Sequence, residues 1–212
     1  DGARYGLKLL GGDTVSTPGP MTAGVTALGY APAGRAVRRA GARAGDDLFV
    51  TGTIGDGWLG LQAAQGGLAE LEEGLRSALA ARYRLPEPRL EFTSLLRARA
   101  SAAMDISDGL VADLGHLCRA SGVGAELDLE RLPLSAGARA WLALQPHAGP
   151  ALAALATGGD DYELLIAAGA SDEQASQGAP LTRVGRIVEG EGVQVRHHGS
   201  ELRVGRGGWR HR

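Results

Sequence analysis

Residues 104–110 read Met-Asp-Ile-Ser-Asp-Gly-Leu, and the rest of the chain can be organised around them. Small residues precede this stretch, and the apolar residues after it recur at the spacing of one helix face. The pattern predicts a short buried strand that ends at Asp105 and a helix that begins near Asp108, capped by Ser107 or Asp108. A carboxylate that closes an apolar strand needs a partner, because burying it unpaired is costly. The residues alone leave open a simple helix cap and a site for a metal ion or phosphate.

Composition limits the possible classes of protein. The chain has 212 residues, enough for one large domain or two small ones, and 44% of them are hydrophobic, which permits a real core. A net charge of −2, 4% aromatic residues and the lack of a basic stripe give nucleic-acid binding little support. The single cysteine, Cys118, fits a reducing compartment. Because no apolar run could span a bilayer and no signal-peptide pattern is present, we expect a cytoplasmic protein that does not contact membranes.

Periodicity and turn residues predict the other elements. The predicted strands cover residues 7–10, 21–30, 47–51, 124–129 and 164–166, and a terminal hairpin pairs 184–188 with 193–197. The predicted helices cover residues 68–82, 92–100, 138–144 and 151–156.

Two glycine pairs followed by acids are candidate ligand loops. Gly11-Gly12-Asp13 leaves the first predicted strand, where glycines let the backbone approach a ligand and Asp13 presents a carboxylate. The alternative is an ordinary turn with a solvated acid. Gly158-Gly159-Asp160-Asp161 enters a later strand, and its adjacent carboxylates repel unless a cation or a hydrogen-bond donor offsets them. The alternative is a solvated turn in which Asp161 caps locally.

Gly55, Gly57 and Gly60 match the G-x-G-x-x-G dinucleotide fingerprint between a strand and a helix. That fingerprint also requires an acid at the end of a second strand about 20 residues later. The acids found there fall in a helix-like stretch instead. The competing interpretation is a glycine-rich turn capped by Asp56.

Two further features could contact an anion or a flat ring. Arg35, Arg38 and Arg39 form a basic cluster whose guanidinium groups suit an anionic ligand, although solvated surface arginines are the simpler interpretation. Trp209 stands in a glycine-rich tail, where it packs over a flat ring or serves as a plain hydrophobic anchor.

Taken together, these stretches resemble the thiamine-monophosphate kinases, which belong to a superfamily with aminoimidazole ribonucleotide synthetase and selenophosphate synthetase. Each motif is weak by itself, but their order and spacing match over nearly the whole chain. The stretches that carry the resemblance are Gly11-Gly12-Asp13-Thr14, Arg39-Ala40-Gly41-Ala42, Thr51-Gly52-Thr53-Ile54-Gly55-Asp56, residues 104–110, Gly158-Gly159-Asp160-Asp161-Tyr162-Glu163-Leu164 and Gly208-Trp209-Arg210-His211.

The resemblance implies a two-domain α/β (α+β) protein. Residues 1–40 would be the remnant of an N-terminal ATP-binding domain that pairs with its copy in a homodimer. Residues 41–212 would form a C-terminal α/β domain, with a mixed sheet flanked by helices, that closes over the substrate. The implied reaction transfers the γ-phosphoryl group of ATP to thiamine monophosphate, giving thiamine diphosphate and ADP, and it requires Mg²⁺. Such a transfer needs positioning and cations more than a nucleophilic side chain.

The resemblance also implies roles for individual residues. The implied magnesium ligands are Asp13, Asp105 and Asp108, and the implied ATP contacts are Gly12, Asp13, Arg39 and Ser107. The implied thiamine contacts are Asp160 and Trp209, with Asp160 standing where the family usually has Glu, so that its reach is one methylene shorter.

One departure concerns the start of the chain. The family carries its first acidic metal motif ahead of the segment that begins here, so we expect an N-terminal truncation and a fragment that is inactive or depends on the absent part. Three alternatives remain open: another ATP-dependent enzyme of the superfamily, a nucleotide-binding dehydrogenase, and a non-catalytic binding fragment.

Overall fold

The computed structural model describes residues 2–169, 181–205, 207 and 208, and the chain divides into two units, Asp1–Ala36 and Val37–Arg212. The described residues of the first unit form no helix or strand, so the strands predicted over 7–10 and 21–30 are wrong. Leu9 and Met21 are both 94% exposed. A strand needs a partner for its amide and carbonyl groups, and the described part of this unit supplies none.

The second unit is built on a seven-stranded mixed sheet, in the order β2-β4-β1-β5-β3-β6-β7. All neighbouring strands are antiparallel except β3 and β6, which run parallel. This confirms the predicted mixed sheet. The strands are β1 (Asp47–Thr51), β2 (Ala100–Asp105), β3 (Gly124–Asp128), β4 (Leu164–Ala168), β5 (Leu181–Val188), β6 (Gly192–His197) and β7 (Ser200–Glu201).

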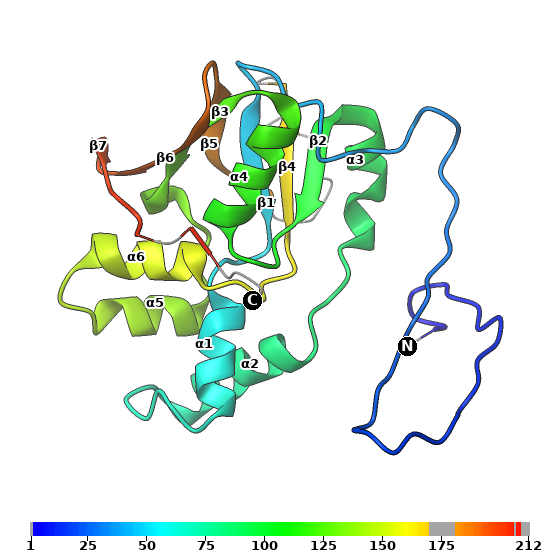
Figure 1. The fold of residues 1–212 in the computed structure, drawn as a ribbon. Helices are drawn as coiled ribbons and strands as arrows, with labels where there is room; N and C mark the ends of the chain where they lie inside the picture. The colour runs from blue at the N-terminus through cyan, green and yellow to red at the C-terminus, as the bar shows by residue number, and fades with distance from the viewer. Residues whose placement is uncertain (1, 170–180, 206, 209–212) are drawn as a thin grey trace. The chain divides into compact units, whose positions relative to one another are not determined.

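Helices flank this sheet, as predicted, and α1, α2, α5 and α6 gather beyond one end of the strands (Figure 1). Trp58 of α1 meets Trp141 of α5 edge to face there, with ring centroids 5.5 Å apart. The helices are α1 (Asp56–Ala64), α2 (Glu73–Arg84), α3 (Thr93–Arg99), α4 (Leu110–Ser121), α5 (Ala136–Ala143) and α6 (Ala148–Thr157), with short 3₁₀ helices η1 (Leu90–Phe92) and η2 (Leu129–Arg131).

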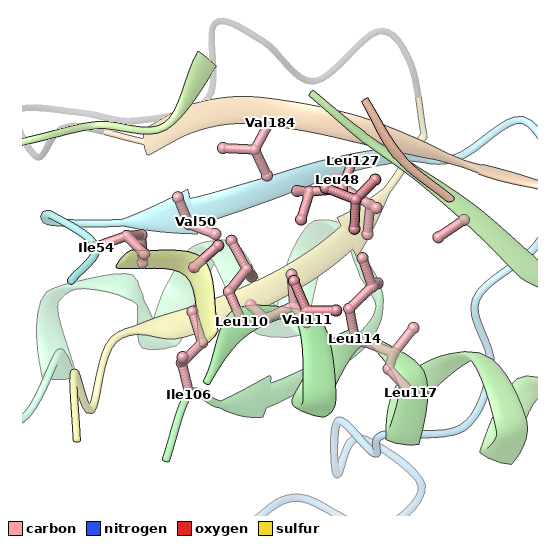
Figure 2. Close-up of a cluster of buried hydrophobic side chains, with 14 of the residues drawn as sticks. Leu48, Val50, Ile54, Ile106, Leu110, Val111, Leu114, Leu117, Leu127 and Val184 are labelled. Atoms are coloured by element: carbon pink, nitrogen blue, oxygen red, sulfur yellow. The ribbon is translucent and has the colours of Figure 1, made fainter. Parts of the chain in front are cut away.

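The main core lies between α4 and one face of the sheet (Figure 2). The apolar stripe read from the sequence is the buried face of α4, and each of its leucines contributes about 1.5–3 kcal/mol by burial. The opposite face of the sheet carries Phe49 and Ile166, which pack with Leu95 and Leu96 of α3. The residues that meet in Figure 2 include Leu110, Val111, Leu114 and Leu117 from α4 and Leu48, Val50, Leu127 and Val184 from the strands.

Two further predictions about elements need correction. The terminal hairpin is wrong, because β3 lies between β5 and β6 and pairs with both of them. Local spacing cannot reveal a strand that arrives from a distant part of the chain. The helix predicted over 68–82 begins only at Glu73, as α2. Among the described residues, no helix has the length and apolarity needed to cross a bilayer.

Candidate functional site

The turn after β2 carries the acids that the sequence singled out. β2 ends at Asp105 as predicted, but this side chain is exposed, so its carboxylate does not need a buried partner. Helix α4 begins at Leu110, close to the predicted start near Asp108, and its N-cap position is Gly109, with φ 113°. Neither predicted side chain caps it, because no side-chain hydrogen bond is made at that position. A side chain at residue 109 would also collide with the Thr157 backbone.

A third acid, Asp113, holds this turn in place. Its Oδ2 accepts hydrogen bonds from the amides of Ser107, at 2.9 Å, and Asp108, at 3.0 Å. Asp113 is buried in the first turn of α4, and burial raises its pKa although these two bonds oppose the rise. No role was predicted for Asp113 from the sequence, although an acid on the apolar face of a predicted helix indicates a buried partner.

A second loop, residues 158–163, is hydrogen-bonded onto the first. The Asp160 amide donates to the Ser107 carbonyl at 2.9 Å, and the Tyr162 amide donates to the Ile106 carbonyl at 2.7 Å. Ile106 returns a bond from its own amide to the Glu163 carbonyl at 2.8 Å. The structure thus brings the turn that carries Asp105, Ser107 and Asp108 against the loop that carries Asp160.

The side chains from these two loops share one negative environment. Tyr162 is 44% exposed, and its hydroxyl lies near the Asp160 carboxylate. Partial burial, together with the charges of Asp160, Asp105 and Asp108, raises the pKa of the Tyr162 hydroxyl. Three of the predicted site residues, Asp105, Asp108 and Asp160, are therefore close together in the structure.

Asp161 is buried against the start of α1, which excludes the solvated turn that was one of its two predicted interpretations. Both of its carboxylate oxygens lie 3.0 Å from the Gly55 amide, and Oδ1 also accepts a bond from the Gly57 amide at 3.0 Å. Burial, only partly offset by these bonds, raises the pKa of Asp161 to about 7. The amides that a bound pyrophosphate would need are already occupied, which removes the structural basis for a dinucleotide site. Asp56 accepts bonds from the hydroxyls of Thr53 and Ser135, both at 2.6 Å.

Below the second loop lies a buried ionic group, the Glu163 cluster, made of Thr51, Arg82, Arg89 and Glu163. Glu163 is 0% exposed and accepts bonds from the Thr51 hydroxyl at 2.7 Å, from Arg82 at 2.8 Å and from Arg89 Nε at 2.6 Å. Burial by itself would raise the pKa of Glu163, but the bonds and charges of its partners outweigh burial and lower it. This cluster was not predicted from the sequence, although an acid directly before an apolar strand indicates a buried partner.

Carboxylate oxygens from α4 and the preceding turn can also approach one another. One ligand atom each from Asp108, Asp113 and His116 lies within 4.8 Å of the others. Hard Mg²⁺ prefers oxygen ligands, so only the two carboxylates of this trio suit it. Those two carboxylates belong to Asp108 and Asp113, and Asp105 is not part of the trio.

The remaining predicted residues belong to other segments of the chain. Gly12 and Asp13 are exposed residues of the first unit, where Asp13 accepts a bond from the Thr14 amide at 2.7 Å. Arg39 is exposed, and its carbonyl accepts a bond from Ser121 at the end of α4 opposite to Ser107. Trp209 lies outside the described residues.

Comparison with known proteins gives the chain its relatives. It is 46% identical to a thiamine-monophosphate kinase of Caulobacter vibrioides, over 100% of this chain and 60% of that protein. A thiamine-monophosphate kinase of Salmonella typhimurium is 43% identical over 86% of this chain and 56% of its own length. The structure "AaThiL complexed with AMPPCP and TMP" superimposes with a TM-score of 0.71 at 38% identity, covering 82% of this chain and 54% of that one. The chain thus spans between half and two thirds of the length of these relatives.

The family assignment rests on a separate match. Residues 43–198 match the family described as "AIR synthase related protein, C-terminal domain". This range contains the whole sheet up to β6, both acidic loops and the Glu163 cluster. The chain therefore belongs to the AIR synthase related family, through its C-terminal domain.

Proposed function

We propose that this chain is the C-terminal part of an ATP-dependent thiamine-monophosphate kinase, with residues 41–212 as the substrate-closing domain and 1–40 as the remnant of an ATP-binding domain. The similarity to kinases of that name supports the reaction, and the complex with AMPPCP, an ATP analogue, and TMP supports the substrate pair. The single structural observation behind the proposal is the pairing of the loop at Ser107 with the loop at Asp160.

The proposed chemistry follows from charge and position. Transfer of a phosphoryl group between two phosphate-bearing molecules needs their negative charges offset and their reacting atoms aligned. Mg²⁺, when bound, would supply that positive charge. Asp105 and Asp108 would hold the metal from the end of β2, while Asp113 fixes the turn that carries them.

Other residues would bind the two substrates. Ser107 and Arg39 would contact ATP, together with Gly12 and Asp13 of the first unit, where Asp13 would also bind metal. Asp160 would contact thiamine monophosphate, with Trp209 stacking on it. Because the chain spans only part of its relatives' length, its activity would depend on the rest of the protein. The full-length protein would act as a cytoplasmic homodimer.

The test is a coupled ADP-release assay on the full-length protein. We expect ADP release to depend on both Mg²⁺ and thiamine monophosphate. If thiamine monophosphate gives no stimulation while another acceptor does, the proposed substrate is wrong and another ATP-dependent enzyme of the superfamily takes its place. If no acceptor stimulates release, a non-catalytic binding role replaces the kinase.

A further inference from the structure

The loop of residues 158–163 adopts a conformation that its sequence does not favour. Asp160 has φ 60° and Tyr162 has φ 50°, both in the left-handed region that residues with side chains rarely enter. Gly159, with φ 78°, precedes them, and a side chain there would crowd the Ser107 carbonyl. Such a conformation persists only where surrounding contacts impose it.

The contacts that impose it converge on the residue that follows. The Glu163 carboxylate is bound by a hydroxyl from β1 and by guanidinium groups from α2 and from the segment before η1. Arg82 also donates to the Asp161 carbonyl, inside the strained turn. Thr51 completes the bracing, because its hydroxyl oxygen accepts a bond from the Leu164 amide at 2.8 Å.

The backbone at Gly52 packs closely against the Glu163 carboxylate. Gly52 has φ 55°, and a side chain at that position would overlap the Glu163 carboxylate. The carboxylate is fully buried, whereas Tyr162 beside it is partly exposed and Asp105 across the turn is exposed. The loop is thus fixed in the interior at Glu163, while the side chain of Tyr162 reaches the surface near the exposed Asp105.

We propose that Glu163 is a positioning residue of the kinase site proposed above. Held by the other members of the Glu163 cluster, it keeps residues 160–162 in their left-handed turn. It thereby sets Asp160 and Tyr162 at a fixed distance from Asp105 and Asp108. Glu163 touches no substrate in this role. Only the expected effect on catalysis rests on the proposed function; the effect on the loop does not.

The first test measures the loop itself and needs no activity. We expect Thr51→Val, which removes the hydroxyl at nearly constant volume, to increase amide hydrogen exchange of residues 158–163 and 105–109 about tenfold or more in the full-length protein. Thr51→Ser keeps the hydroxyl, so exchange in these residues should remain as slow as in the wild-type protein. Asp47→Asn is the matched control, since Asp47 is a buried acid at the other end of β1 that pairs with Arg183. Equal exchange at these loops in Thr51→Val and wild type would overturn the proposal.

The second test separates positioning from stability. For Thr51→Val and Glu163→Gln, we expect kcat per folded molecule to fall roughly ten- to a hundredfold, with a smaller change in KM for ATP, at temperatures well below unfolding. Asp47→Asn should lower the unfolding temperature and leave kcat unchanged. If the Glu163→Gln protein does not fold, Thr51→Val and Arg89→Lys carry the measurement.

The two arms distinguish the proposals. Normal kcat in Thr51→Val, with thiamine monophosphate as acceptor, would overturn the positioning role even if loop exchange increased. A wild-type protein that shows no kinase activity would refute the proposed function, while the exchange experiment would still decide whether Glu163 holds the loop.

Discussion

Both carboxylate oxygens of Asp161 lie 3.0 Å from the backbone amide of Gly55. An acid of the second loop therefore occupies the start of α1, and the turn that resembled a nucleotide-binding fingerprint is closed by the protein's own side chain. The contact also ties the loop that carries the predicted substrate residue Asp160 to the start of α1. The contribution of this contact to stability depends on whether the Asp161 carboxylate is charged.

The pH dependence of stability should report on Asp161. Its folded pKa of about 7 lies above the unfolded value, so the native state binds the proton more tightly and stability falls as pH rises from about 4 to about 7. Relative to Asp161→Asn, wild-type stability should drop by roughly 2 kcal/mol between about pH 5.5 and pH 8. Urea unfolding of both proteins measures this, and parallel pH profiles would contradict the assignment.

Magnesium dependence should report on the first loop. We expect Asp105→Asn and Asp108→Asn in the full-length protein to lower turnover by about a hundredfold or more, because they remove oxygen ligands from the proposed metal site. Since Asp105 is exposed, its replacement should change stability by no more than about 0.5 kcal/mol. Glu191→Gln, in the exposed turn before β6, is the control. Near-normal turnover of either variant at limiting Mg²⁺ would remove that residue as a ligand.

The close approach of α1 to the second loop predicts a steric effect. A side chain at Gly57 would overlap the Asp160 carbonyl, so Gly57→Ala should destabilise the protein by about 2 kcal/mol or more. Gly74 in α2 has open space around it, and Gly74→Ala should be neutral or stabilising by up to about 1 kcal/mol. Denaturant unfolding compares the two, and equal stabilities would show that α1 and the loop are not in contact.

Cys118 should be unreactive in the folded protein. Burial in the core raises the pKa of its thiol to about 11, so little thiolate exists near neutral pH. A thiol-specific reagent at about pH 8 should modify it slowly in buffer and rapidly in denaturing urea. Rapid modification without denaturant would mean that α4 separates readily from the sheet.

Several elements could be predicted from the sequence because their causes are local. The stripe of α4 follows from apolar residues three and four apart, and the end of β2 at Asp105 follows from the change from small apolar to acidic residues. The position of β3 between β5 and β6 could not be predicted, because strand order depends on segments far apart in the chain. Likewise, 106 residues separate Asp161 from Gly55, and no local pattern joins them.

The sequence by itself determined which residue types stand at the strand ends: an acid that closes β2, a serine and a second acid in the turn after it, and two adjacent acids before β4. Only the tertiary structure decided that Asp161 is buried and Asp160 is not. The physical reason is that a carboxylate is buried at low cost only where hydrogen-bond donors are positioned to bind it. Those donors, the amides at the start of α1, come from a distant segment that packing brings into reach.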